Sequence, residues 1–83
     1  MNVRIKYFAS IREAVGQGTE AVQTHSETAG ALRDELIARG APYAGALARG
    51  RAVRMAVDQV MHDETAVLHD GCEVAFFPPV TGG

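Results

Sequence analysis

The first third of the chain alternates between polar and apolar side chains. Residues 2–8 (NVRIKYF) follow a period of two, which is typical of a half-buried strand. Phe8 is the exception, because it shares its face with two cations. The next stretch, residues 9–20 (ASIREAVGQGTE), closes with two glycines that suit a turn. Residues 20–25 (EAVQTH) then predict a second strand, antiparallel to the first.

The middle of the chain changes to a helical period. Thr28 can cap the first turn through its hydroxyl, and Gly40 supplies a left-handed stop. Gly30 weakens the first turn by about 1 kcal/mol relative to alanine. Pro42 opens a shorter helical piece that extends through Leu47. The apolar stripe of the main helix comprises Ala29, Leu32, Leu36 and Ile37, and the residues expected to face water are Arg33, Asp34 and Arg39.

The last third is β-like again. Residues 51–57 (RAVRMAV) predict a strand, and Asp58–Gln59 a tight turn that leads into Val60 and Met61. Residues 62–71 form a loop that closes with an Asp-Gly turn signal. Residues 72–77 (CEVAFF) predict the final strand, which ends at Pro78–Pro79 because neither proline has an N–H to donate.

This order of elements, β-β-α-β-β, predicts an α+β domain with one main helix on one face of a mixed sheet. We expect residues 1–77 to form the domain and residues 78–83 a flexible tail. The expected core consists of Val3, Ile5, Leu32, Leu36, Val57, Val74 and Phe76.

The composition of the chain argues against several classes of function. Eighty-three residues suffice for one small domain, and a net charge of −2 argues against a nucleic-acid partner. No apolar run reaches membrane-spanning length, and the alternating N-terminus predicts no signal peptide. The single cysteine excludes an internal disulfide and fits a cytoplasmic protein. The histidines lie far apart, so we expect no metal site and no cofactor bound by this chain.

Conventional catalytic motifs are weak. The GQG at residues 16–18 lacks the rest of a phosphate-binding loop, and no segment resembles a nucleophile elbow. No residue of this chain is recognisably equipped to bind ATP.

The tail carries the clearest chemical signal. Pro78 and Pro79 make a stiff exit, while Gly82 and Gly83 provide narrow backbone without side chains. Six residues from Pro78 reach at most about 20 Å when extended, so the tail could thread a narrow channel in a partner. The terminal carboxylate is ionised at neutral pH, with a reference pKa of roughly 3.3–3.7, and needs activation before it accepts a nucleophile. The alternative is a frayed terminus that happens to contain glycine.

Three segments resemble the MoaD family, the sulfur-carrying small subunits of molybdopterin synthase. Residues 70–83 (DGCEVAFFPPVTGG) are similar to the family's D-G-D-E-V-A-F-F-P-P-V-T/S-G-G terminus. Residues 3–16 resemble its first strand and following loop, and AVDQ at 56–59 resembles its A-V-N-x segment. Cys72 stands where the family often has an acidic residue, and Asp58 where asparagine is usual.

The resemblance implies a ubiquitin-like β-grasp fold and a role as a non-catalytic subunit. A MoeB-like, E1-like partner would use Mg-ATP to adenylate the Gly83 carboxylate, and a persulfide donor would convert it to a thiocarboxylate. The tail, Pro78, Pro79, Val80, Thr81 and Gly82, would then thread into a MoaE-like large subunit of a heterotetrameric synthase. There the sulfur would pass to cyclic pyranopterin monophosphate, and two transfers would build the molybdopterin dithiolene.

Alternation also suggests a docking patch. Phe8 and Phe77 fall opposite the expected core, and we expect them to form this patch together with Met61. The alternative is that one or two of the three cover only the core edge. Cys72 falls on the inward face, where a lone cysteine usually acts as a small hydrophobe rather than a sulfur relay. Arg4, Lys6 and Arg12 are solvated or contact an acidic partner, and His62 and His69 are expected in loops.

Two rival functions share these features. The first is a sulfur carrier for another pathway, thiazole synthesis or tRNA thiolation, although the aromatic approach AFFPPVTGG favours molybdopterin. The second is a protein modifier joined through Gly83 to a lysine of a target, which would give a stable conjugate on a denaturing gel.

Overall fold

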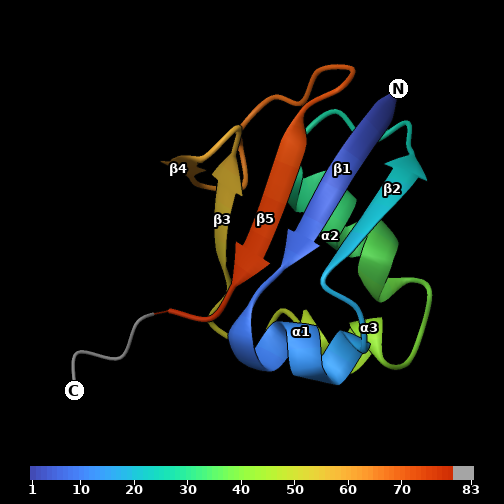
Figure 1. The fold of residues 1–83 in the computed structure, drawn as a ribbon, viewed down its shortest axis with the longest axis vertical. Helices are drawn as coiled ribbons and strands as arrows, with labels where there is room; N and C mark the ends of the chain where they lie inside the picture. Colours follow the sequence, from blue (N-terminus) through green and yellow to red (C-terminus); the bar gives the residue numbers. More distant parts are fainter. Residues whose placement is uncertain (80–83) are drawn as a thin grey trace.

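The computed structural model describes residues 1–79 as an α+β domain (Figure 1). The strands and helices of this part follow one another along the chain as β1 (Asn2–Tyr7), α1 (Ala9–Val15), β2 (Thr19–Gln23), α2 (Ala29–Ile37), α3 (Tyr43–Ala46), β3 (Arg54–Val57), β4 (Val60–His62) and β5 (Glu73–Phe77).

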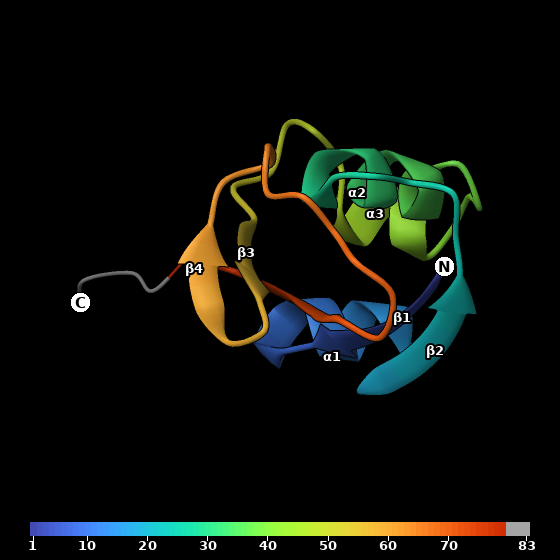
Figure 2. The same cartoon turned by 90° about the horizontal axis from the view of Figure 1, so that it is seen from above.

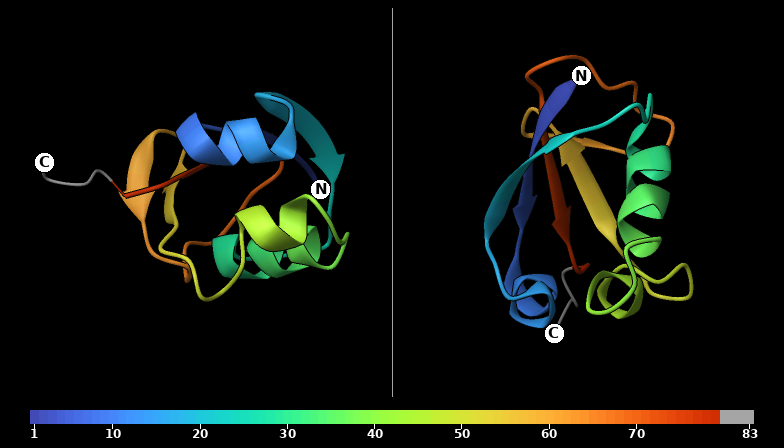
Figure 3. Two further views of the ribbon diagram at one scale, coloured as in Figure 1. Left: turned by 90° about the horizontal axis from the view of Figure 1, so that it is seen from below. Right: turned by 90° about the vertical axis from the view of Figure 1, so that its right-hand side faces the viewer.

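The strands of the described region form one mixed sheet in the order β2-β1-β5-β3-β4. The first and last strands, β1 and β5, are parallel neighbours at its centre, and the other pairs are antiparallel. Helix α2 covers one face of the sheet (Figure 2). Helices α1 and α3 lie together at the end where β1 and β5 finish (Figure 3). The start of the tail, Pro78–Pro79, lies beside residues of both helices.

The core lies between the sheet and α2, and its composition confirms the prediction. Every residue expected there is buried, with the largest exposed fraction only 7%, at Val57. Tyr7 and Cys72 are also buried on this inward side. The hydroxyl of Tyr7 donates to Glu20 (2.9 Å) at the edge of the core, and burial together with that carboxylate raises its pKa. The predicted α+β class is correct.

Residues 9–15 form a helix that the sequence interpretation missed. Ile11 and Val15 are its buried residues, and Gly16 ends it in the left-handed conformation. Its N-cap is Phe8, whose side chain makes no capping hydrogen bond, so the usual Ser/Thr/Asp/Asn signal is absent. Seven residues with two apolar positions give too short a pattern to indicate a helix by periodicity.

The β3–β4 hairpin also differs from the prediction. The strand expected over residues 51–57 begins only at Arg54, and the residues after the turn form a short strand, β4, that was not expected. His62 consequently ends a strand, whereas His69 lies in a loop as expected. The predicted turn is confirmed: Asp58 and Gln59 have φ angles of 50° and 68°, which a tight hairpin turn requires.

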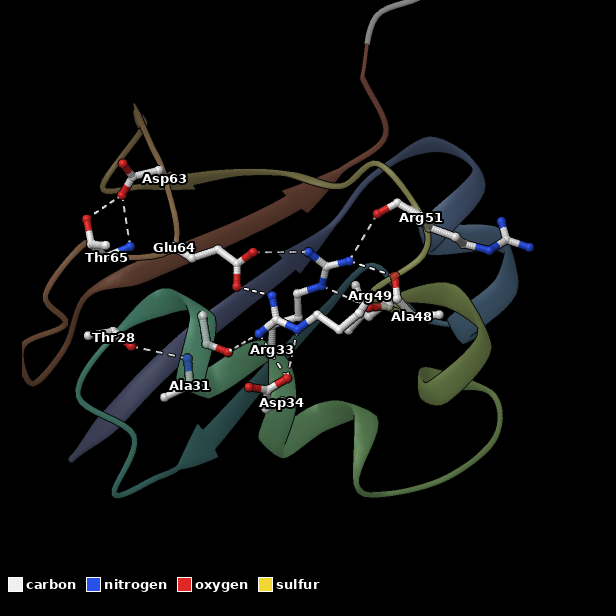
Figure 4. A network of polar contacts seen from close by, with 12 residues as sticks. Thr28, Ala31, Arg33, Asp34, Ala48, Arg49, Arg51, Asp63, Glu64 and Thr65 are labelled. Atoms are coloured by element: carbon white, nitrogen blue, oxygen red, sulfur yellow. Dashed lines mark hydrogen bonds and ion pairs between the residues drawn. The ribbon is translucent and has the colours of Figure 1, made fainter.

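Arg33 corrects another expectation, because its side chain is only 4% exposed rather than solvated (Figure 4). Its guanidinium donates to the carbonyls of Leu47, Ala48 and Arg51, at 2.8, 2.7 and 3.1 Å. These bonds attach the segment after α3 to helix α2. Arg33 also lies 3.6 Å from Glu64, which pairs in turn with Arg49.

The start of α2 is held by two features. Thr28 accepts a hydrogen bond from the Ala31 N–H (3.1 Å), so the predicted cap is confirmed. The Gly30 N–H donates to the Glu64 carbonyl (2.9 Å), and a Cβ on Gly30 would lie 2.8 Å from the Glu64 Cβ. Glycine is needed here because the 63–66 loop packs directly against the helix backbone.

Candidate functional site

Phe8 and Phe77 form an aromatic pair beside the base of the tail. Their ring centroids are 6.3 Å apart and the rings cross at 87°, an edge-to-face geometry. The Phe8 N–H donates to the Phe76 carbonyl (3.1 Å), so the chain leaving β1 stays beside the end of β5. Phe8 is 45% exposed and Phe77 is half-buried. The structure thus brings together two of the three residues predicted for the patch.

Met61 lies on the same face but farther across the sheet. It pairs with Ala56 of β3, and Ala56 pairs with Ala75 of β5. Directly paired residues project to the same face, and Phe77 projects with Ala75 because they are two apart. Met61 is 54% exposed. The two alanines are buried between larger neighbours, so together these side chains make a shallow apolar strip.

We call the residues Phe8, Met61, Ala56, Ala75 and Phe77 the apolar strip. The role of its alanines was missed from the sequence. The available signal was the alternation itself, since Ala75 shares the outward face of its strand with Phe77. A small outward residue between two large ones predicts a flat surface on which a partner can lie.

Charged residues border the apolar strip on the same side of the sheet. Lys6 of β1 is directly paired with Ala75 of β5, and its ammonium forms an ion pair with Glu73 (3.1 Å). Arg54 is directly paired with Phe77 in the register, and Arg4 with Glu73. Three cations and one carboxylate thus surround an apolar centre, the usual arrangement of a polar rim around an interface core.

The tail starts from this region. Pro78 and Pro79 are half-buried, so they pack against the body of the domain. They line a hollow with the first residues of α1, the end of α3 and residues 51–53. The predicted sulfur-bearing residue Gly83 and the threading residues Val80, Thr81 and Gly82 lie outside the described residues.

Several other candidates lie away from this face. Cys72 is fully buried and unpaired by a disulfide, as expected for a small core residue. Among residues 1–79, no group of three or more His, Cys, Asp or Glu side chains is placed to hold a metal ion. No helix in the same region has the length and apolar character needed to cross a bilayer. Arg12 is exposed, with its guanidinium against Gly18.

An exposed His–Asp pair marks the opposite end of β5. His69 Nε2 lies 2.8 Å from Asp58 Oδ2, and the other carboxylate oxygen accepts the Glu73 N–H (3.0 Å). The hydrogen bond from the Glu73 backbone and the contact with His69 lower the pKa of Asp58. The Asp58 carboxylate raises the pKa of His69. This pair joins the hairpin turn to the loop before β5 and lies far from the tail.

Comparison with known proteins gives a consistent family. The model of the ThiS family matches residues 5–83. The molybdopterin synthase sulfur carrier subunit of Escherichia coli is 41% identical over 81 residues, which cover 98% of this chain and 99% of that protein. The protein of the same name from Haemophilus influenzae is 35% identical over the same coverage.

Solved structures support the fold. SAMP1 from Haloferax volcanii superposes with a TM-score of 0.77 at 24% identity, covering 100% of both chains. A structure of the complex of subunits 1 and 2 of the molybdopterin-converting factor from Helicobacter pylori contains a chain that matches with a TM-score of 0.68 at 20% identity, again covering 100% of both chains. The domain has the expected ubiquitin-like β-grasp fold, and the chain belongs to the ThiS family of small sulfur carriers, in which it resembles the molybdopterin synthase subunits over nearly its full length.

Proposed function

We propose that this chain is the sulfur-carrier small subunit of a molybdopterin synthase. The observation that carries the proposal is the full-length likeness to proteins of that name, at 41% identity in the E. coli case. The apolar strip at the base of the tail supports it, because a carrier must dock on partners with the tail pointing into their active sites.

The chemistry follows from the terminal group. The Gly83 carboxylate is ionised at neutral pH and is a poor electrophile. An E1-like partner therefore first converts it to an acyl-adenylate, using Mg-ATP held by that partner. The outer sulfur of a persulfide donor then attacks the acyl carbon and displaces AMP, which leaves an acyl disulfide to the donor. A second thiol cleaves this disulfide, is itself oxidised to a disulfide with the donor, and leaves a thiocarboxylate on Gly83. In the large subunit this group gives its sulfur to cyclic pyranopterin monophosphate, and two such transfers complete the dithiolene.

The residues of this chain bind and position, while the acids and bases belong to the partners. Phe8 and Phe77 anchor the docked domain, and Met61 extends the contact across β3. Gly82 leaves clearance in a narrow channel, because a side chain there would obstruct it. Pro78 and Pro79 provide a stiff exit from the sheet. We place the reaction in the cytoplasm, where the free thiol of Cys72 stays reduced.

Intact mass spectrometry tests the carrier chemistry. The chain is incubated with its activating enzyme, Mg-ATP and a sulfur donor. A carboxylate that has been activated can exchange one oxygen for sulfur, which adds about 16 Da. The matched control is the chain lacking Gly83, which should show no gain. A wild-type chain that keeps its mass under these conditions contradicts the proposal.

Reconstitution separates this function from its rivals. The sulfur-loaded chain, mixed with the large subunit and the pterin precursor, should form molybdopterin. Transfer only to a thiazole precursor or a tRNA would identify another sulfur pathway. A ladder of conjugates that survives a denaturing gel would instead indicate a protein modifier linked through Gly83.

A further inference from the structure

A groove runs between helices α1 and α3 at the end of the domain where the tail begins. Two hollows, of about 240 and 250 Å³, share Ser10, Ile11, Ala46 and Arg51 in their walls. The two hollows therefore adjoin each other, and we call them together the end groove. Pro78 and Pro79 line the first hollow, and Gly45 lines the second. The lower end of the domain in Figure 3 shows the two helices that form its sides.

We propose that the end groove receives this chain's own tail, residues 80–83, while the carrier is free of partners. The tail leaves Pro79, which is itself part of the groove wall. Four extended residues reach about 14 Å, comparable with the width of a helix, about 10–12 Å. Residues 80–83 are thus attached directly beside the groove, so they can bind there without diffusing from elsewhere.

The shape of the groove suits this occupant. Its walls contain small side chains, including those of Ser10 and Ala46, and Gly45 has no side chain at all. Apart from the chain neighbours of Gly45 and the backbone of its own helix, no atom of the described residues lies within 4 Å of the position that a Cβ on Gly45 would occupy. Walls with small side chains and open space at Gly45 leave room for a diglycine backbone.

The charge of the groove also suits it. Arg51 is the one ionisable residue in the walls of the two hollows, and no acidic residue is among the described residues that line them. Its carbonyl accepts a hydrogen bond from Arg33, but its exposed guanidinium has no hydrogen bond or ion pair with any other described residue. A single cation with open donors complements a single terminal carboxylate.

The consequence is a competition between the groove and the partners. The inference rests on the proposed function only in taking the Gly83 carboxylate as the terminal group. A seated tail holds that group, or the thiocarboxylate made from it, beside Arg51 and makes it less available to unintended nucleophiles. Exposed ion pairs are weak and screened by salt, so a partner that binds the apolar strip can withdraw the tail readily.

Nuclear magnetic resonance relaxation on the isolated full chain tests whether the tail binds in the end groove. Order parameters of the Thr81, Gly82 and Gly83 amides should exceed 0.6, the upper limit of flexible backbone, and fall in 1 M salt. Arg51→Gln and Gly45→Leu should each bring them below 0.6, the first by removing the cation and the second by filling the groove. Arg4→Gln and Gly50→Leu are matched controls outside the groove and should leave the wild-type values unchanged.

The outcomes separate this inference from the proposed function. Order parameters below 0.6 in the wild type, or values unaffected by both groove variants, would show that the tail does not bind in the end groove. If Gly45→Leu weakens large-subunit binding while the free tail remains mobile, the groove receives a partner segment, and self-docking is wrong. None of these measurements needs sulfur, ATP or the activating enzyme. The carrier chemistry is tested separately, by intact mass spectrometry.

Discussion

The Phe8 and Phe77 rings meet edge to face on the open side of the sheet, 6.3 Å between centroids, although 69 positions separate them in the sequence. Phe8 follows β1 and Phe77 ends β5, so the pair depends on the parallel alignment of the first and last strands. This pair lies on the face of the sheet opposite α2, with Phe8 exposed and Phe77 half-buried, so it contributes little to the core. Its position beside the tail points to binding.

We therefore expect Phe77→Ala and Phe8→Ala to weaken large-subunit binding at least tenfold, about 1.4 kcal/mol. Each substitution removes an aromatic anchor from the apolar strip. Isothermal titration calorimetry gives the affinity, and urea unfolding checks that the fold is intact. Val67→Ala is the matched control, because Val67 is 74% exposed and outside the strip. Unchanged affinity in both phenylalanine variants would show that the strip is not the docking surface.

Gly30→Ala should lower the free energy of unfolding by about 1–3 kcal/mol. Alanine favours a helix by about 1 kcal/mol over glycine, but its Cβ would lie 2.8 Å from the Glu64 Cβ. Gly45→Ala is the matched control, since its Cβ meets open space, and it should be neutral or stabilising by up to about 1 kcal/mol. Urea denaturation measures the free energy of unfolding of the two variants. If Gly30→Ala is as stable as Gly45→Ala, the 63–66 loop moves aside freely and the contact does not require glycine.

Arg33→Met should cost about 2–3 kcal/mol of stability, because three carbonyls lose a charged donor. For a domain of this size the melting temperature should fall by at least about 8 °C. Arg33→Lys should recover only part of the loss, since one ammonium cannot reproduce the guanidinium fork. Arg4→Met, on the exposed face, should change stability by less than about 0.5 kcal/mol. A melting temperature for Arg33→Met equal to that of Arg4→Met would contradict the role of Arg33.

Stability should depend on pH through Asp58 and His69. The pKa of His69 is raised in the fold, so its contribution is present below the unfolded value, about 6.5, and is lost as pH rises through the folded value. The pKa of Asp58 is lowered, so its contribution is present above about 3.9 and is lost as pH falls further. The pair therefore contributes most between about pH 4 and 6.5.

Urea unfolding between pH 5 and 9 measures this dependence. His69→Gln should flatten the decline in stability above about pH 6.5, where the wild type loses the imidazolium. His25→Gln is the control, because His25 is exposed and makes no hydrogen bond with the other described residues. An identical pH profile for wild type and His69→Gln would show that the contact with Asp58 does not stabilise the fold.

Local patterns were enough to place most of the elements. The period of two in residues 2–8, the Thr28 cap, and the Pro-Pro end of β5 act within a few residues of one another, so the sequence carries them directly. The same holds for the terminal motif and the family resemblance. Helix α1 escaped notice because its cap is a phenylalanine and only two of its residues are buried.

Periodicity and residue type were sufficient to predict the class of fold, the core and the chemistry of a diglycine terminus. Which distant residues meet depends instead on how whole strands and helices pack. The β-grasp topology set Phe8 against Phe77, buried an arginine that periodicity had assigned to solvent, and placed Arg51 in the groove where the tail begins. Those relationships arise from the alignment of separate strands and helices, which no local pattern encodes.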